Sequence, residues 1–218
     1  MSYDFAVIAT DGFETAEEAL QICDALFDDP GGDPSAAVVD LIDELERRDA
    51  IGGDDDDDDG FLSIWPVDAN ARGAVLCTRR SHGTTYGMLE LTKDRGLAVV
   101  DLQIRQLFDP RGRVEVHVST GNATTLPYLT ERILHDVMAR QDWFGDQVVI
   151  KRGEQLYAQA AYALDTDCIV EYRDGGPDRQ YRTTTSDRAT VARMLWGWTI
   201  HGPSDAVLRT QEWDRVSF

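Results

Sequence analysis

The sequence predicts an α+β protein made of two small mixed domains, each a mostly antiparallel sheet covered by helices. Short strand-like segments are interspersed with amphipathic helical segments in both halves, and 42% of the 218 residues are hydrophobic, which is enough for packed cores. Charge is spread unevenly. Residues 1–110 hold 25 Asp and Glu against 8 Lys and Arg, a balance of -17, whereas residues 111–218 hold 15 against 13, a balance of -2. Turn-forming residues over 109–112 coincide with this change, so we expect domains over 1–110 and 111–218.

The first half begins with an alternating segment over 3–9 that predicts a strand. Thr15 and Glu18 then form a capping-box pattern, which predicts the start of a helix. A second helix is expected to begin after Ser35 and to end near Arg48. The other elements predicted in this half are strands over 61–66, 73–79 and 97–101 and a helix over 81–94.

The second half opens with Val114, Val116 and Val118 alternating with polar residues, which predicts a half-buried strand. Thr124 or Thr125 is expected to cap a helix that runs to about residue 140. The other elements predicted here are strands over 147–152, 156–164, 168–173, 179–184 and 212–218, and a helix over 186–200 with the apolar stripe Ala189, Ala192, Leu195, Trp196 and Thr199. Because Trp196 and Trp198 flank Gly197 at helical spacing, we expect one indole in the core and the other at its edge.

The net charge of -19 predicts repulsion from nucleic acid and from anionic membranes, and attraction to a basic protein. The alternative reading is that the charge serves solubility alone. Six consecutive aspartates, Asp54–Asp59, predict a solvated loop. Calcium binding there is an alternative, but the spacing lacks the EF-hand pattern and its closing glutamate, so no metal is predicted.

Signatures of common enzyme sites are missing from the sequence. It has no glycine-rich phosphate loop, no closely spaced cysteine or histidine pair and no nucleophile elbow. We therefore expect no catalysis and no cofactor; the alternative is an enzyme that uses a strand-borne carboxylate such as Glu171 or Asp101. The widely spaced Cys23, Cys77 and Cys168 are expected to be buried apolar residues rather than disulfides. With no signal peptide and no long apolar run, a cytoplasmic location is expected.

Two resemblances add to this interpretation. The opening segment over 1–7 and the segment Gly96–Asp101 resemble a family of uncharacterised actinobacterial proteins that open M-S-Y-D-L-A-V. The segment Ile169–Gly175, the helix over 186–200 and the ending over 212–216 are similar to immunity proteins of bacterial polymorphic toxin systems. This second resemblance implies a protein that binds and occludes a cognate toxin, such as a basic nuclease or a nucleic-acid deaminase. Asp54–Asp59 and the segment over 79–86 depart from the family patterns.

The second predicted helix and the loop that follows it carry the carboxylates that we expect to meet a basic partner. Such an acidic face would speed the encounter with a basic toxin domain. The predicted partner-binding residues are Asp40, Asp43, Glu44, Glu46, Asp54, Asp55, Asp56, Asp57, Asp58 and Asp59. An adaptor or structural module with no toxin partner is the alternative function.

Overall fold

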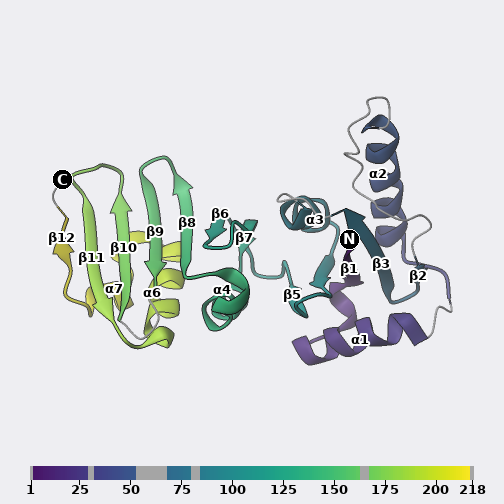
Figure 1. The fold of residues 1–218 in the computed structure, drawn as a ribbon, viewed down its shortest axis with the longest axis horizontal. Helices are drawn as coiled ribbons and strands as arrows, with labels where there is room; N and C mark the ends of the chain where they lie inside the picture. Colours follow the sequence, from purple (N-terminus) through teal and green to yellow (C-terminus); the bar gives the residue numbers. More distant parts are fainter. Residues whose placement is uncertain (1, 29–31, 53–67, 80–83, 163–166, 217–218) are drawn as a thin grey trace. The chain divides into compact units, whose positions relative to one another are not determined.

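The computed structural model describes residues 2–28, 32–52, 68–79, 84–162 and 167–216 (Figure 1). The chain divides into two compact units, residues 1–111 (unit 1) and residues 112–218 (unit 2), one residue after the expected boundary. Each unit combines helices with an antiparallel sheet, which confirms the predicted α+β class. No helix in the described part of the chain is both long enough and apolar enough to cross a membrane.

Unit 1 is built around a five-stranded sheet with the strand order β2-β3-β1-β4-β5. Its central strand β1 pairs antiparallel with both β3 and β4. The elements of unit 1 are β1 (Ser2–Ala9), a short 3-10 turn (Thr10–Gly12), α1 (Ala16–Asp28), α2 (Ala36–Gly52), β2 (Asp68–Asn70), β3 (Gly73–Arg79), α3 (Thr84–Thr92), β4 (Leu97–Asp101) and β5 (Gln106–Phe108).

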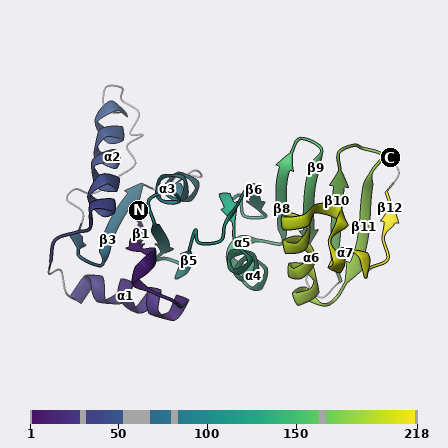
Figure 2. The same ribbon diagram turned by 180° about the vertical axis from the view of Figure 1, so that it is seen from behind.

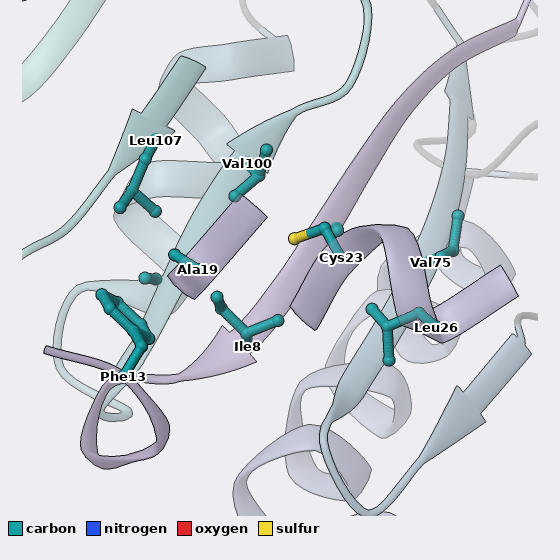
Figure 3. Close-up of a cluster of buried hydrophobic side chains, with 10 residues drawn as sticks. Ile8, Phe13, Ala19, Cys23, Leu26, Val75, Val100 and Leu107 are labelled. Atoms are coloured by element: carbon teal, nitrogen blue, oxygen red, sulfur yellow. The ribbon is translucent and has the colours of Figure 1, made fainter. Parts of the chain in front are cut away.

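Both faces of this sheet are buried, which the alternation of polar and apolar residues in β1 does not suggest. Ala6 and Ile8 lie on the face that packs against α1, where Cys23 and Leu26 belong to one apolar cluster with them (Figure 3). Phe5 lies on the other face, which α2 and α3 cover with side chains such as Val38, Leu41, Leu45, Met88 and Leu89. Residues 5–8 are accordingly all 0% exposed, and β1 is the centre of a three-layer unit.

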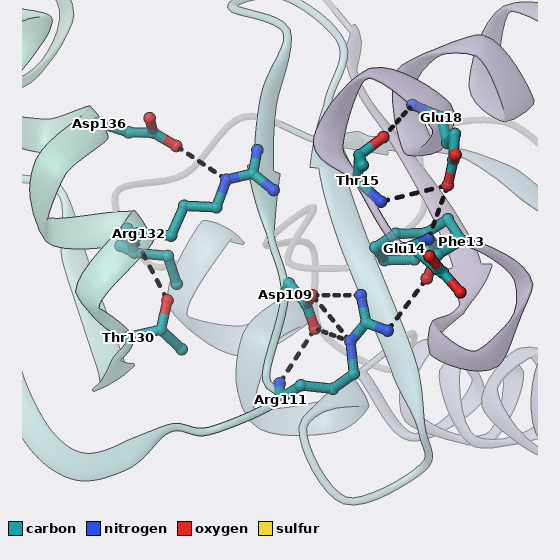
Figure 4. Close-up of polar contacts among 10 residues, drawn as sticks. Phe13, Glu14, Thr15, Glu18, Asp109, Arg111, Thr130, Arg132 and Asp136 are labelled. Atoms are coloured by element: carbon teal, nitrogen blue, oxygen red, sulfur yellow. Dashed lines mark hydrogen bonds and ion pairs between the residues drawn. The ribbon is translucent and has the colours of Figure 1, made fainter.

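The capping box at the start of α1 forms as predicted (Figure 4). The Glu18 backbone N–H donates to Thr15 Oγ1 at 3.2 Å, and the Glu18 carboxylate accepts from the backbone N–H groups of Glu14 and Thr15 at 2.8 and 3.2 Å. These two backbone donors lower the pKa of the Glu18 carboxyl because they stabilise its ionised form. The box therefore satisfies amide groups that the first helical turn would otherwise leave without partners.

Unit 1 ends at Arg111, whose side chain is held by several contacts at once (Figure 4). The guanidinium donates to the Asp109 carboxylate at 2.7 Å and to the Phe13 carbonyl oxygen at 3.0 Å, and it lies 4.5 Å from the centre of the Phe13 ring. The neighbouring Asp109 carboxylate raises the pKa of Arg111. These contacts fix the end of unit 1 to the turn that precedes α1.

Unit 2 contains a seven-stranded antiparallel sheet with the order β12-β11-β10-β9-β8-β6-β7. The elements of unit 2 are β6 (Val114–Thr120), β7 (Thr125–Leu129), α4 (Glu131–Ala139), α5 (Gln141–Phe144), β8 (Gln147–Gly153), β9 (Leu156–Ala161), β10 (Cys168–Asp174), β11 (Gln180–Thr185), α6 (Arg188–His201), a 3-10 turn (Gly202–Ser204), α7 (Ala206–Arg209) and β12 (Asp214–Arg215). Successive strands from β8 to β11 are antiparallel neighbours, so this part of the sheet is a meander.

The helix expected from Thr124 or Thr125 to about residue 140 is wrong in its first turn. Residues 125–129 instead form the edge strand β7, which pairs with β6. Pro127 suits an edge strand because it has no N–H to donate to a second neighbour. The helix begins at Glu131, where the Thr130 hydroxyl accepts from the Ile133 backbone N–H at 3.2 Å (Figure 4 shows Thr130).

Other predicted elements shift in their bounds. The predicted strand over 61–66 and the start of the helix predicted over 81–94 lie outside the described residues, and α3 ends at Thr92. The short strands β2 and β5 were not predicted. Of the closing strand predicted over 212–218, residues 217 and 218 lie outside the described residues, and the described part forms a strand only at Asp214–Arg215. These pieces are two or three residues long, so their pairing depends on neighbouring strands rather than on a local pattern.

α6 covers one face of the unit 2 sheet and contacts β8 to β11, with α4 and α7 packed beside it (Figure 2). Its apolar stripe is shifted from the predicted one: Ala189 is exposed and Trp196 is partly exposed, whereas Trp198 is 0% exposed. The buried positions of the helix are Val191, Ala192, Met194, Leu195, Gly197, Trp198 and Thr199. One indole therefore lies in the core and the other at its edge.

Gly197 lets α6 approach the turn before α7. A Cβ atom at this position would lie 2.5 Å from the carboxyl carbon of Asp205. Asp205 is 9% exposed, and its carboxylate accepts from the Val207 N–H at 2.8 Å and caps α7. The glycine in the Trp-Gly-Trp segment therefore has a packing role.

We expect Gly197→Ala to lower the free energy of unfolding of unit 2 by about 1–3 kcal/mol, because the added methyl group must displace a buried carboxylate. Urea denaturation followed by circular dichroism measures this change. Gly153→Ala is the matched control, since its Cβ would meet only the Leu156 side chain at 3.8 Å. Its effect should stay within about 0.5 kcal/mol. Equal stability of the two variants would contradict the packing role of Gly197.

Candidate interaction surfaces

The predicted acidic face lies on the outer side of α2. Asp40, Asp43 and Glu46 are exposed there, and Val39, which precedes Asp40, is 39% exposed. Within the described residues none of these three carboxylates forms an ion pair, so their charges act outward from the helix. The structure therefore brings together three of the ten predicted partner-binding residues on one helix face.

Glu44, the fourth predicted residue of α2, has a different environment. Its carboxylate accepts from Arg48 Nε at 2.7 Å and also pairs with Arg47. The two guanidinium groups, Arg48 first, lower the pKa of the Glu44 carboxyl. Its charge is thus largely compensated within the helix. The remaining six predicted residues, Asp54–Asp59, lie outside the described residues.

A second surface is the face of the unit 2 sheet that α6 does not cover, which we call the open face. Side chains alternate along each strand, so the register assigns the paired residues of β8 to β11 to one face or the other, up to the irregularity in β8 between Lys151 and Gly153. Val148, Ala158 and Val170 are buried on the α6 side. The open face carries Gln147, Val149, Lys151, Tyr157, Gln159, Ala161, Ile169, Glu171, Arg173, Gln180, Arg182 and Thr184. In Figure 1 this sheet lies in front of α6, and in Figure 2 it lies behind.

A hydrogen-bonded carboxylate lies at the centre of the open face. Glu171 is only 5% exposed, although no helix in the described part of unit 2 lies over its strand face. Its Oε1 accepts from Arg182 Nε at 2.6 Å, and its Oε2 accepts from Gln159 Nε2 at 2.6 Å and from Gln180 Nε2 at 3.4 Å. Cross-strand pairing places Gln159 and Arg182 directly beside Glu171 on the two neighbouring strands. The side chains of these neighbours, rather than a covering element, account for the burial of the carboxylate.

Arg173 extends this network toward the end of the strands. Its guanidinium donates to Gln155 Oε1 at 2.9 Å and to Gln180 Oε1 at 3.2 Å, and it lies 5.3 Å from the centre of the Tyr157 ring. The Tyr157 hydroxyl also donates to Gln180 Oε1 at 3.3 Å. Each side chain of this network is therefore held by at least one neighbour, and the centre of the open face presents its polar groups in a fixed arrangement. Such preorganisation lowers the entropy lost when a partner binds.

The two carboxylates considered for catalysis both have structural partners. Glu171 is neutralised by Arg182, and Asp101 Oδ1 accepts from the backbone N–H groups of Gln103 and Ile104 at 3.0 and 3.3 Å. Asp101 is 2% exposed and stabilises the turn after β4. The contacts of Glu171 are typical of a carboxylate in a side-chain ion pair, and those of Asp101 are typical of a carboxylate that accepts backbone hydrogen bonds in a turn.

The described residues contain no group of three or more His, Cys, Asp or Glu side chains arranged to hold a metal ion. Cys23 and Cys168 are buried, as predicted, and Cys77 is partly exposed; all three are free thiols. Burial raises the pKa of the Cys23 thiol to about 12 and also raises that of Cys168. Both groups are therefore protonated at neutral pH, whereas nucleophilic attack requires the thiolate.

Sequence reasoning missed the open face as a surface. The signal was present in residues 169–173, where Ile169, Glu171 and Arg173 alternate with the buried Val170 and Tyr172. That alternation predicts a strand with one exposed face. It does not show that the polar side chains of three strands form one network, because that depends on the strand order.

We expect Arg182→Ala to lower the free energy of unfolding of unit 2 by about 1–3 kcal/mol, because it leaves a buried carboxylate with amide donors only. Thermal and urea denaturation measure the change. Arg193→Ala is the matched control, since Arg193 and Asp187 form an exposed pair at 4.0 Å. Its effect should stay below about 0.5 kcal/mol. Similar losses in both variants would show that Arg182 acts as an ordinary surface residue.

Comparisons of the chain with protein-family models, with curated proteins and with solved structures found no match.

Proposed function

We propose that this chain is a non-enzymatic binding protein, and that it acts in the cytoplasm as an immunity protein that occludes a basic toxin domain. The observation that carries the proposal is the open face of unit 2, a solvent-facing sheet surface whose central polar side chains are hydrogen-bonded to one another. It lies in the half of the chain that resembles immunity proteins. A rigid surface of mixed character suits specific contact with another protein.

The acidic face of α2 supports the same proposal in a different way. Exposed carboxylates at Asp40, Asp43 and Glu46, within a chain of net charge -19, attract a basic protein over a distance of roughly the Debye length of 8–10 Å. Such attraction raises the association rate more than the lifetime of the complex. Under this proposal α2 accelerates encounter, and the open face forms the close contacts.

The first test is capture of proteins from the host lysate by the tagged full chain at low and moderate salt, with identification by mass spectrometry. We expect one basic protein, whose toxic activity the purified chain then abolishes at equimolar concentration. Ile169→Arg should reduce this capture at least ~10-fold, because Ile169 is 40% exposed on the open face.

The matched control is Ile200→Arg, which introduces the same charge at a residue 38% exposed on α6. This variant should capture the partner as the wild type does. Equal losses in both variants would remove the open face from the proposal. A captured partner without toxic activity would favour the adaptor alternative.

The α2 surface is tested by association kinetics with the identified partner. Neutralising three carboxylates together, Asp40→Asn, Asp43→Asn and Glu46→Gln, should lower the association rate constant several-fold at low salt and flatten its dependence on ionic strength. The dissociation rate should change little. Stopped-flow or surface-based binding between about 20 and 300 mM salt measures both rates. Unchanged association would contradict the attraction assigned to α2.

A further inference from the structure

An exposed tryptophan occupies a turn of unit 2 that neither proposed surface includes. Trp143 lies in the four-residue helix α5 and is 45% exposed, whereas its neighbour Phe144 is 2% exposed. Among the described residues, the other large hydrophobic side chains with substantial exposure are aliphatic: Val39, Ile169 and Ile200. Tryptophan is enriched at the energetically important centres of protein interfaces because it buries a large apolar area with few rotatable bonds.

The backbone around Trp143 is held by a neighbouring turn. Asn122, in the turn between β6 and β7, donates from its side-chain nitrogen to the Trp143 carbonyl oxygen and from its backbone N–H to the Phe144 carbonyl oxygen. Its side-chain oxygen accepts from the Thr120 hydroxyl at 2.7 Å and from the Thr124 N–H at 3.0 Å. One asparagine therefore joins both turns and leaves the indole presented on a fixed backbone.

Two glycines allow the turns to approach this closely. Gly145 has a φ of +80°, and a Cβ atom there would lie 2.7 Å from the carbonyl carbon of Gly121. A Cβ atom on Gly121 would in turn lie 2.9 Å from the Asp146 backbone nitrogen. Side chains at either position would separate the turns. The support for Trp143 is thus a packed structure rather than an isolated loop tip.

The charges flanking Trp143 indicate which partner would fit. Asp142 and Asp146 are both exposed, while Arg140 on the preceding turn is only partly exposed. An indole beside two exposed carboxylates is complementary to an apolar pocket bordered by Lys or Arg. We infer that Trp143 is an anchor residue that inserts into an apolar pocket with a basic rim on a protein partner. The inference rests on the proposed function, because it assigns a contact to the same basic partner.

The inference can be tested without the natural partner, by using two synthetic peptides of equal positive charge. One peptide carries Leu-Leu-Phe between flanking lysines, and the other carries serines in place of these three residues. Both are titrated into the ¹⁵N-labelled full chain, and the tryptophan indole N–H signals are followed, with Trp143→Phe assigning the signal of Trp143. We expect the apolar peptide to shift that signal and to bind at least ~10-fold more tightly than the serine peptide.

Trp143→Ala should abolish the difference between the two peptides, and its spectrum shows whether unit 2 remains folded. Ile200→Ala, at a similarly exposed residue of the same unit, should preserve the difference. Replacing Asp142 and Asp146 with asparagine should weaken the binding of both peptides by a similar factor. The change removes the electrostatic attraction to the lysines but leaves Trp143 in place. Equal affinity of the two peptides for the wild type, or shifts confined to α2, would overturn the inference. If the Trp143 signal shifts with protein concentration in the absence of peptide, the residue takes part in self-association, and this result would also overturn the inference.

The two proposals can fail separately. If Trp143→Ala captures and neutralises a toxin as efficiently as the wild type does, the anchor role of Trp143 is contradicted and the proposed function stands. Discrimination between the peptides at Trp143, without any toxin among the captured proteins, would support the anchor and remove the immunity role.

Discussion

Burial of one face of the unit 2 sheet under α6 is the packing contact on which this unit depends. The helix contacts β8, β9, β10 and β11, and Trp198, at 0% exposure, belongs to its buried side. Gly197 of the same helix lets α6 pass against the Asp205 cap of the next helix. Since no second helix among the described residues of unit 2 covers the opposite face, that face must be compatible with water. The surface proposed for binding is therefore a direct consequence of the way the core is built.

A solvent-facing sheet surface can still contain groups that are largely desolvated. Glu171 shows this, because long polar side chains on both neighbouring strands lie over its carboxylate. Each polar group removed from water must find a partner, and on the open face Glu171, Gln180 and Arg182 supply partners for one another. Mutual hydrogen bonding then restricts the rotamers of all the participants. A surface ordered in this way loses little further freedom when a partner binds.

Unit 1 uses its sheet differently, and this limits where it can interact. Helices cover both faces, so residues 5–8 of its central strand are entirely buried and, within the described residues, neither face of the sheet is left open. Interaction is left to the outer sides of helices, and the outer side of α2 carries Asp40, Asp43 and Glu46. The two units thus have different physical roles in the proposed function. Long-range attraction depends on net charge and tolerates many arrangements, whereas close contact depends on the fixed geometry of unit 2.

The sequence by itself determined those features that depend on local pattern and composition. It predicted the α+β class, the capping box at Thr15 and Glu18, most of the longer strands and the acidic side of α2, because each follows from residues close together in the chain. Only the tertiary structure decided that residues 125–129 pair as a strand, that β1 is buried on both faces and that Glu171 has partners on two strands. It also decided that Asn122 and Gly145 meet beneath Trp143. These features join residues far apart in sequence, and their energies depend on strand order and packing that no local pattern records.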